Sequence, residues 1–475
     1  MAHVDDAIVI AGAGIAGLSA AYRLQGEANT PFVVFEKAAE VGGYSRTIRH
    51  GDFRFDLGGH RFYTKKAHVQ KLVEDVINDD LVTVDRVSRI LFRGRYFDYP
   101  LSMFNTLKAL GMLGAAHAVF DYGRMKAGRA LCRDGPEDTF EQWALNRFGR
   151  YLYEAFFRVY TEKTWGVPCT ELSADFAEQR IKGLSFREAV KEAILRKGDS
   201  DSLLRRFIYP RYGFGQITDR LAEAVREPNR VLTSHAVVAV EHEGGRVTAV
   251  TADGPNGPLR QPCGEFVNCI PIDELVRLLQ PAPPAEVLAA AEQLRFRSLV
   301  ILFLILDRPQ LSPDHWIYVP SPEIGFCRLH EPKNWSADMA PPEQTGVVLE
   351  FFCQEGDERW HQSHEDLTAE ATRDLEAMGL LEPGCVSDST ALRLRKAYPV
   401  YNLGYGEHMR VLTEYLAGFG NLYNIGRNAT FRYTSSDHYI DMGLKAAENL
   451  LGHEHDLDAI GLESGYAETW RKGER

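Results

Sequence analysis

No apolar run in this sequence is long enough to cross a membrane as a helix. The longest uninterrupted stretch, Leu299 to Leu306, has eight residues, whereas a membrane-spanning helix needs about 20. The opening residues MAHVDD are acidic, whereas a secretory signal peptide begins with basic residues. We therefore expect a cytoplasmic protein without a membrane span.

Cysteine is scarce and forms no pattern. The 475 residues include seven cysteines, with no CxxC pair and no spacing typical of metal ligands. An odd number of scattered cysteines favours reduced, buried thiols over a disulfide framework or a zinc site. We expect no bound metal.

Positive charge is in deficit. Lys and Arg number 54 against 66 Asp and Glu, which gives a net charge of −12. This excess of negative charge opposes non-specific attraction to nucleic acid or to an anionic membrane surface. Neither is an expected partner, and an anionic ligand would have to meet cations that are gathered locally.

The first glycines of the chain follow a strand pattern and open a helix pattern. Gly12, Gly14 and Gly17 form GxGxxG between the apolar run AIVIA and the helical spacing of LSAAYRL. In such a turn the glycines permit close approach of the backbone to a pyrophosphate, which meets the N–H groups of the helix. Glu36 ends a second strand pattern, where its carboxylate can accept hydrogen bonds from a ribose diol. The pattern predicts a dinucleotide site.

A second glycine loop favours FAD over NAD. Gly42-Gly43-Tyr44-Ser45-Arg46 follows Glu36 and ends in a cation, and no second GxGxxG occurs. This loop resembles the extension found in flavoproteins of the amine oxidase and protoporphyrinogen oxidase type. Gly426-Arg427 after a strand pattern and Asp437-His438 before a helix pattern are similar to the segment that closes over the flavin in those families.

Several further motifs resemble UDP-galactopyranose mutases and span nearly the whole chain. The motifs are GGHRFYT at 58–64, YPLSMFN at 99–105, YTEKTWG at 160–166 followed by Arg180-Ile181, HWIY at 315–318, RLHEPK at 328–333, and YPV at 398–400. The end of the chain is more similar to eukaryotic members than to bacterial ones. A counterpart of the tryptophan-rich uridine-binding segment of bacterial members is missing, and Ser102 stands where some members carry an amide, which leaves the sugar and the nucleobase open.

The resemblance implies an FAD-dependent isomerase that interconverts the pyranose and furanose forms of a nucleotide sugar. Reduced flavin N5 would act as the nucleophile at the anomeric carbon, and the protein would supply cations for the departing diphosphate. An external electron donor such as NAD(P)H would keep the flavin reduced. The resemblance leaves the oligomeric state unknown.

The residues and the resemblance together give three sets of site residues. The cofactor-binding set is Gly12, Gly14, Gly17, Glu36, Gly43, Arg46, Gly59, His60, Arg427 and Asp437. The substrate-binding set is Tyr99, Trp165, Arg180, Trp316, Tyr318, Arg328, Tyr398 and Tyr433. The catalytic set is His60, Arg180 and Arg328, where the guanidinium forks would grip the diphosphate.

Each assignment has a structural alternative. Arg180 and Arg328 could be salt-bridged surface residues, the tyrosines could be core aromatics, and the tryptophans are as consistent with a core as with a pocket. Glu331 is expected to be a salt-bridge partner. For the whole chain, the runner-up is an FAD-dependent oxidoreductase that acts on a sugar, an amine or another small molecule. A third possibility is a flavin-binding scaffold without activity.

The pattern predicts an α/β fold built from non-contiguous segments. It combines a Rossmann-like FAD-binding domain, a mainly helical domain and a substrate domain with an antiparallel sheet. The expected segments are 1–98, 198–272 and 398–475 for the FAD-binding domain, 99–197 for the helical domain, and 273–397 for the substrate domain. The pattern also predicts two strands between Leu81 and Tyr99, a hairpin over 231–253 that turns at Gly244-Gly245, and a last helix from about Ile440 to Leu451.

Overall fold

The computed structural model describes residues 7–27, 31–92, 94–98, 114, 116–127, 137–180 and 206–462. The chain divides into two compact units, each assembled from separate stretches of sequence. The first unit comprises Met1–Thr83, Ile208–Arg295 and Tyr405–Tyr466. The second comprises Val84–Phe207, Phe296–Gly404 and Ala467–Arg475. The predicted assembly from non-contiguous segments is confirmed, while the bounds and the domain role given to each of the five predicted segments stay predictions.

A parallel sheet with the strand order β20-β13-β1-β2-β9 forms the centre of the first unit. Its strands are short apolar runs such as IVIA and FVVF, which are buried along their whole length, as expected for strands covered on both faces. The bounds are β1 Ile8–Ala11, β2 Phe32–Phe35, β9 Arg230–Leu232, β13 Glu265–Asn268 and β20 Leu422–Asn424. This sheet is the predicted Rossmann-like core.

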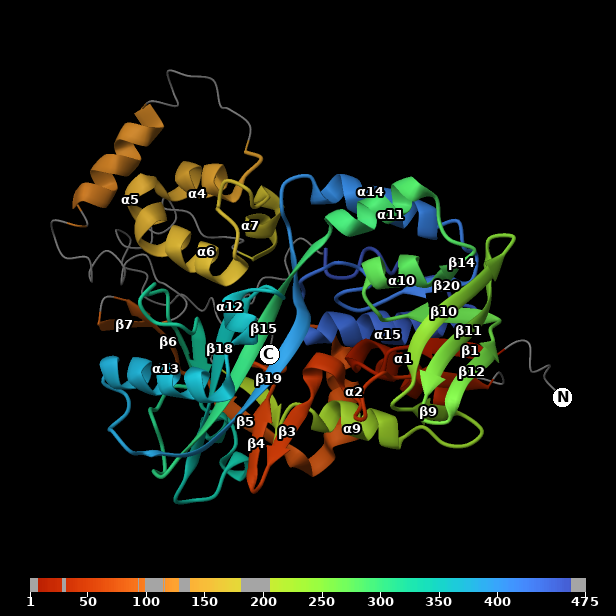
Figure 1. The fold of residues 1–475 in the computed structure, drawn as a ribbon, viewed down its shortest axis with the longest axis horizontal. Coiled ribbons are helices and arrows are strands. Elements are labelled where there is room, and N and C mark those ends of the chain that lie inside the picture. The colour runs from red at the N-terminus through yellow and green to blue at the C-terminus, as the bar shows by residue number, and fades with distance from the viewer. Residues whose placement is uncertain are drawn as a thin grey trace. The chain divides into compact units, whose positions relative to one another are not determined.

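Helices and smaller sheets complete the first unit. Helix α1 packs along α15 (Figure 1), and β10 and β11 form the hairpin predicted to turn at Gly244-Gly245. The helices are α1 Ile15–Gln25, α2 Ala67–Ile77, α9 Gln216–Glu223, α10 Ile272–Leu278, α11 Ala285–Gln293, α14 Tyr405–Leu416 and α15 Ser436–Leu450. The remaining strands are β3 Thr47–His50, β4 Phe53–Asp56, β10 Ala236–Glu243, β11 Arg246–Gly254, β12 Gly257–Pro262 and β14 Leu279–Gln280.

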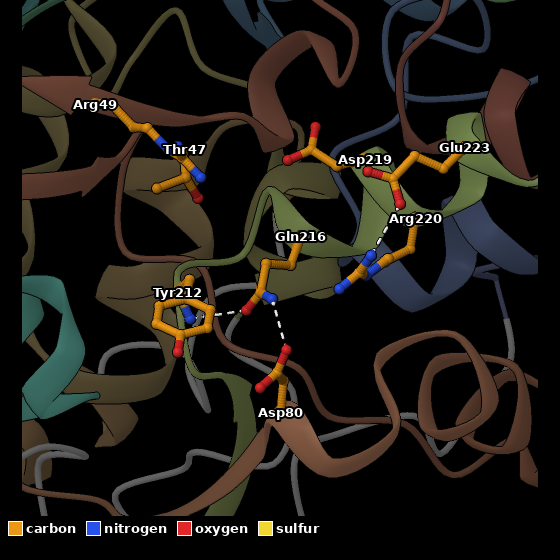
Figure 2. Close-up of a pocket in the computed structure, with 8 residues that line it drawn as sticks. All are labelled: Thr47, Arg49, Asp80, Tyr212, Gln216, Asp219, Arg220 and Glu223. Atoms are coloured by element: carbon orange, nitrogen blue, oxygen red, sulfur yellow. Dashed lines mark hydrogen bonds and ion pairs between the residues drawn. The ribbon is translucent and has the colours of Figure 1, made fainter.

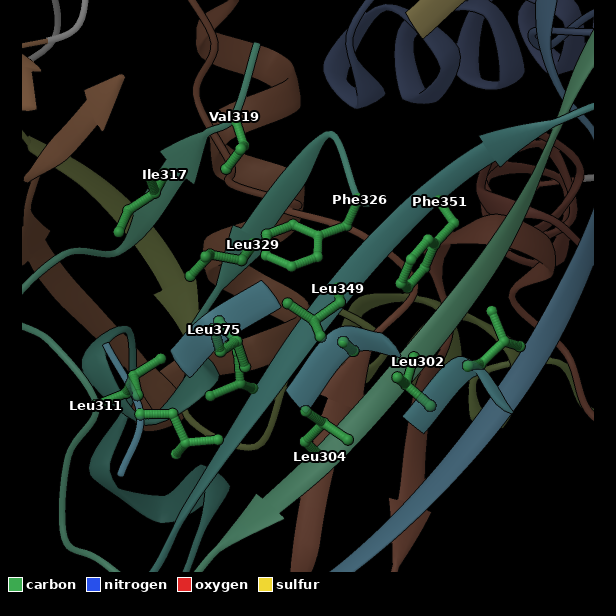
Figure 3. Close-up of a cluster of buried hydrophobic side chains, with 14 of the residues drawn as sticks. Leu302, Leu304, Leu311, Ile317, Val319, Phe326, Leu329, Leu349, Phe351 and Leu375 are labelled. Atoms are coloured by element: carbon green, nitrogen blue, oxygen red, sulfur yellow. The ribbon is translucent and has the colours of Figure 1, made fainter. Parts of the chain in front are cut away.

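The second unit contains a mixed, mainly antiparallel sheet in the order β19-β15-β18-β17-β16-β6-β7. Leucines of β15 and β18 alternate with residues of the opposite face and pack with α13 in an apolar cluster (Figure 3) that includes Leu302, Leu349 and Leu375. The strands are β6 Ser88–Phe92, β7 Arg95–Asp98, β15 Arg295–Leu306, β16 Trp316–Tyr318, β17 Arg328–His330, β18 Thr345–Cys353 and β19 Val386–Val400. This is the antiparallel sheet that the sequence predicts.

Helices of the second unit come mainly from the region predicted to be helical. A capping box, in which Thr139 accepts from the Gln142 N–H and the Gln142 side chain accepts in return, starts α4. The bounds are α4 Phe140–Phe148, α5 Arg150–Leu152, a π-helical turn Tyr153–Arg158, α6 Val159–Trp165, α7 Ala174–Arg180, α12 Glu358–His361 and α13 His364–Ala377.

Two local predictions need correction. The stretch 81–99, expected to hold two strands, holds three in its described residues. Strands β6 and β7 form a hairpin, and a separate strand, β5 (Leu81–Asp85), ends before β6 begins at Ser88. Strand β8 spans Arg206–Pro210. Helix α15 begins at Ser436 rather than near Ile440. The polar residues that precede its apolar face belong to its first turn, because Ser and Asp are favoured at helix starts.

Candidate active site

The GxGxxG turn lies at the carboxyl end of β1, in the centre of the parallel sheet of the first unit. Gly12 has φ of +107°, and a Cβ on Gly17 would lie 2.1 Å from the Gly12 carbonyl oxygen. Gly14 differs, since no described heavy atom beyond its neighbours lies within 4 Å of a Cβ built there. No side chain of the described chain caps α1 at Gly14. The helix N-terminus therefore offers N–H groups and open space to an anion.

The Gly42-Gly43 loop lies against this turn. The Gly42 N–H donates to the Ala13 carbonyl over 2.7 Å, and Gly42 and Gly43 both have positive φ, +101° and +54°. The Arg46 Nε donates to the Gly43 carbonyl over 3.1 Å. The predicted cation is thus held at the end of the loop, beside the nucleotide turn.

Glu36 is buried at the end of β2, with each carboxylate oxygen fixed by a backbone N–H. Ala13 N and Ala38 N both donate to it over 2.9 Å. A carboxylate oxygen has two lone pairs, so a ribose hydroxyl can still donate to this group. The residues at this turn fit the adenosine and pyrophosphate parts of FAD. They provide the uncapped N-terminus of α1, the open space at Gly14, the oriented carboxylate of Glu36 and the nearby guanidinium of Arg46.

His60 lies in a loop between β4 and α2 of the first unit. The loop turns at Gly58, which has φ of +114°, and the His60 N–H donates to the Gly58 carbonyl over 2.8 Å. The imidazole stacks on the Phe214 ring, with centroids 5.2 Å apart and planes at 26°. The position of the ring is therefore set by a residue far away in the sequence.

The closing segment contacts the start of α1. Gly426 has φ of +87°, and a Cβ there would lie 3.3 Å from the Ala16 Cβ. The Arg427 guanidinium lies over the Tyr433 ring at 5.4 Å and donates from Nε to the Tyr439 hydroxyl. Asp437 is fully buried in the first turn of α15 and accepts from the Ser435 hydroxyl over 2.5 Å. Cofactor contact by Arg427 and Asp437 stays a prediction.

Five predicted substrate residues form one cluster in the second unit: Trp165, Trp316, Tyr318, Arg328 and Tyr398. Arg328 and Tyr318 face each other in the register of β16 and β17, and the Arg328 Nη2 donates to the Tyr398 hydroxyl over 3.0 Å. The Tyr398 ring meets Trp165 edge-on at 6.1 Å, and Trp316 lies 5.5 Å from Tyr318. Trp165 is buried and Trp316 half-buried.

Other predicted residues are not placed in this cluster. Tyr433 belongs to the first unit. Arg180 is the last residue of α7 and its side chain lies outside the described part of the structure, as does the whole of Tyr99.

Sequence reasoning missed the counter-charge of Arg328. Glu350 on β18 is buried and accepts a short hydrogen bond from the Arg328 Nη2, and its second oxygen lies 4.0 Å from the His330 Nδ1. The arginine is thus both clustered with tyrosines and salt-bridged. The available signal was a single acid within the apolar strand TGVVLEFFC.

Two further cations hold the backbone around this cluster. The Lys163 Nζ donates to the carbonyls of Val319, Ser321 and Phe326 over 2.8 to 3.0 Å, and burial lowers the pKa of this ammonium. Arg297 donates from Nε to the Thr164 carbonyl at the end of α6 over 2.9 Å. These contacts give a structural reason for the lysine of YTEKTWG.

Glu331 and Lys333, near the end of the RLHEPK motif, also hold the surrounding chain in place. Glu331 was expected to form a salt bridge, but within the described chain it accepts hydrogen bonds from Leu311 N, Ser312 N, the Thr345 hydroxyl and the Asn334 amide instead. Burial raises the pKa of Glu331, and these hydrogen bonds oppose that rise only in part. The Lys333 Nζ donates to four carbonyl oxygens, of Pro309, Pro341, Pro342 and Gln344.

A polar pocket of about 210 Å³ in the first unit holds none of the predicted site residues (Figure 2). Gln216 accepts from the Tyr212 N–H and donates to Asp80 there, and Arg220 pairs with Glu223. Its two arginines, Arg49 and Arg220, are outnumbered by the carboxylates of Asp80, Asp219 and Glu223, so the pocket does not favour an anionic substrate. Among the described residues, no helix is long and apolar enough to span a bilayer, and no group of His, Cys, Asp and Glu side chains is placed to hold a metal ion.

Comparisons with known proteins identify the fold. The crystal structure of reduced UDP-galactopyranose mutase superposes with a TM-score of 0.83 at 22% identity, over 97% of both chains. Putrescine oxidase bound to putrescine superposes with a TM-score of 0.63 at 18% identity, over 94% of this chain and 99% of that one. A "probable UDP-galactopyranose mutase" from Klebsiella pneumoniae is 27% identical over 177 residues, which are 36% of this chain and 44% of the relative. The match thus spans less than half of that relative.

The family model for flavin-containing amine oxidoreductases matches residues 15–451. The match begins at Ile15, after Gly12 and Gly14 of the nucleotide turn, and includes Gly17, the His60 loop, the Arg328 cluster and the closing segment. It agrees with a nucleotide turn that fits FAD. The chain therefore belongs to the family of flavin-containing amine oxidoreductases, and its cofactor is FAD.

Proposed function

We propose that this chain is an FAD-dependent mutase that interconverts the pyranose and furanose forms of a nucleotide sugar. The observation that carries the proposal is the cluster of Arg328 with Tyr398 and Tyr318 on the sheet of the second unit. A guanidinium and phenolic hydroxyls are donors suited to a diphosphate. The fold shared with UDP-galactopyranose mutase over 97% of both chains supports the same assignment.

Reduced FAD, when bound, supplies a nucleophile for the anomeric carbon through its N5 atom. The chain's own task is to hold and stabilise the diphosphate as it leaves, because the leaving group gains negative charge in the transition state. Arg328 is 12% exposed, and charge interactions are stronger away from bulk water. Its hydrogen bond to Tyr398 fixes the orientation of both donors. Trp165 and Trp316 would shield the sugar.

The reaction is tested with the flavin in both oxidation states. The protein, reduced with dithionite under anaerobic conditions, is incubated with UDP-galactopyranose and a panel of other nucleotide sugars, and products are separated chromatographically. We expect an isomer of unchanged mass only with reduced protein, since a mutase has no net redox change. Turnover by the oxidised protein with stoichiometric formation of peroxide would contradict the proposal.

The Arg328 assignment is tested by UDP binding. Arg328→Ala should leave FAD content unchanged and weaken UDP binding by about 10- to 150-fold, the value of one hydrogen bond to a charged group. Arg328→Lys should rescue poorly, because Lys lacks the planar fork. Arg180→Ala should behave in the same way.

Arg359→Ala is a matched control for Arg328→Ala. Arg359 also lies in the second unit, pairs with Glu370 and sits 4.9 Å over the Phe351 ring, while Arg328 pairs with Glu350 and sits 5.0 Å over Phe352. We expect unchanged UDP affinity for the control. Equal losses in both variants, or no loss in Arg328→Ala, would reject Arg328 as a diphosphate ligand.

An oxidoreductase is the second candidate, favoured by the ion pair between Arg328 and Glu350. This pair has no net charge, so a neutral substrate could occupy the cluster at little electrostatic cost. Consumption of one acceptor per turnover, with no isomer formed from any nucleotide sugar, is the result that would select this function.

A further inference from the structure

Two buried carboxylates lie at the two ends of the loop that carries His60. Asp56 ends β4 directly before the loop, and Asp441 on α15 contacts Lys66, the last residue of the loop. The exposed fraction is 2% for Asp56 and zero for Asp441. Both belong to the first unit, and neither belongs to a motif that the sequence singled out.

Asp56 joins three separate segments of the first unit. Its Oδ1 accepts from the Thr47 hydroxyl over 2.6 Å and from the Phe214 N–H over 3.0 Å, and its Oδ2 accepts from the Tyr209 hydroxyl. Thr47 directly follows Arg46, and the Phe214 ring stacks on His60. One carboxylate thus fixes the neighbours of two predicted cofactor contacts, Arg46 and His60.

The turn that carries Phe214 is packed directly on Thr47. The Gly215 N–H donates to the Thr47 hydroxyl over 2.8 Å. A Cβ on Gly213 would lie 2.3 Å from that hydroxyl, and one on Gly215 would lie 2.4 Å from the Thr47 nitrogen. Because no side chain fits between these segments, a shift of Thr47 moves Phe214 with it.

Asp441 anchors the other end of the loop to the helix pair α1 and α15. It accepts from the Lys66 Nζ over 2.5 Å and contacts the His68 Nε2 at 2.7 Å, with the Lys445 Nζ at 3.4 Å. Burial raises the pKa of Asp441, but hydrogen bonds from Lys66 and His68 outweigh burial and hold the pKa below its usual value. Two residues further on, a Cβ on Gly443 would lie 2.2 Å from the Ala16 carbonyl, so α15 is seated closely on the helix that begins at the nucleotide turn.

We propose that Asp56 and Asp441 are positioning residues that clamp the two ends of the 57–66 loop and so set His60 and Arg46 for FAD. The proposal rests on FAD as the cofactor and on the predicted contacts of His60 and Arg46, and it does not depend on mutase activity. Burial raises the pKa of Asp56 to about 6, although the hydrogen bonds from Thr47, Tyr209 and Phe214 lower it. This raised pKa is consistent with the proposal. A carboxylate that costs folding stability when ionised is expected where function requires it.

The test measures FAD binding to flavin-stripped protein, the visible spectrum of the bound flavin, and the melting temperature of the apoprotein. Asp56→Ala and Lys66→Met should each weaken FAD binding by about tenfold or more and shift the flavin absorption band. Asp56→Asn should restore most of the affinity, because its amide retains an oxygen for the Phe214 N–H and can donate to Tyr209. Tyr209→Phe, which preserves the shape of the ring, should give an intermediate loss if Asp56→Ala does not fold.

Matched controls separate positioning from general destabilisation. Lys71→Met removes an exposed lysine of α2 that pairs with Asp75, and Val287→Ala destabilises the buried side of α11. We expect both to keep the wild-type FAD affinity and flavin spectrum, even where Val287→Ala lowers the melting temperature. The proposal is overturned if the clamp variants keep wild-type affinity and spectrum, or if a control of equal melting temperature shows the same losses.

Discussion

Arg328 illustrates how one residue can satisfy two interpretations at once. It contacts Tyr398, as a diphosphate ligand of this cluster would, and it also forms a salt bridge with Glu350, as the structural alternative expected, although the pair is buried and not on the surface. Breaking a buried ion pair from one side leaves an uncompensated charge and is costly. Glu350 therefore controls both the stability of the second unit and the charge that a ligand meets.

Glu350→Gln should separate these two effects. We expect the free energy of unfolding to fall by about 1–3 kcal/mol, since Gln still accepts from Arg328 but no longer carries charge. UDP affinity should rise by about 3- to 10-fold, because the carboxylate that repels a diphosphate is gone. Titration with UDP, combined with melting temperatures with and without UDP, measures both. An unchanged UDP affinity would argue that no anion binds beside Arg328.

Asp56 should make stability depend on pH in an unusual direction. Its pKa is raised from 3.8 to about 6 in the folded chain, chiefly by burial. The unfolded chain releases this proton near pH 4, while the folded chain keeps it until about pH 6. The free energy of unfolding therefore falls as the pH rises through this window. Protonated Asp56 contributes about 3 kcal/mol to the free energy of unfolding. This contribution is fully present below pH 4 and is lost above pH 6.

The comparison with Asp56→Asn isolates this contribution. The difference in free energy of unfolding, wild type minus variant, should fall by about 3 kcal/mol between pH 4 and pH 7. Denaturant unfolding at several pH values gives the difference, in which all other titrating groups cancel. A flat difference would mean that Asp56 titrates alike in the folded and unfolded chains.

At the scale of elements, the turn from β1 to α1 is the part that sequence reasoning describes most completely. A Cβ on Gly17 would collide with the Gly12 carbonyl at 2.1 Å, so this glycine is required by the fold itself. Gly14 has ordinary φ of −76° and open space around a Cβ. The fold does not require glycine there, and we predict that the pyrophosphate of FAD does.

Gly14→Ala should therefore separate cofactor binding from folding. We expect the apoprotein to keep its stability within about 1 kcal/mol, while FAD affinity falls at least about tenfold because the Cβ occupies the space for the phosphates. Gly17→Ala, in contrast, should destabilise the apoprotein by about 1–3 kcal/mol through overpacking. Thermal melting of apoprotein and FAD titration check both variants. Equal FAD affinity in Gly14→Ala and wild type would place the pyrophosphate elsewhere.

What the sequence could predict depends on how local the signal is. Patterns a few residues long predict strands β1, β2 and β20 of the parallel sheet and the Gly244-Gly245 hairpin, and the resemblance of short motifs to a known family implies the residues of the Arg328 cluster. Asp56 and Asp441 could not be found in this way, because their partners Phe214 and Lys66 lie 158 and 375 residues away. Such pairs exist only after non-contiguous segments have assembled.

At the scale of the whole molecule, the predicted ligand contacts divide between the two units. The residues that fit FAD belong to the first unit and the Arg328 cluster belongs to the second. With a net charge of −12, the protein as a whole does not attract an anionic ligand, so each anion must be held by cations and hydrogen-bond donors gathered locally. The two ligands should therefore leave separate footprints on the backbone.

Hydrogen exchange can map these footprints. FAD added to flavin-stripped protein should slow amide exchange in the first turn of α1 and at Gly42 to Ser45, because bound ligands suppress local opening. UDP added to the FAD-bound protein should slow exchange in β16 and β17, and this protection should vanish in Arg328→Ala but persist in Arg359→Ala. Protection by UDP confined to the Gly12 to Gly17 turn would show instead that UDP displaces FAD, and it would remove the second unit from the proposed substrate site.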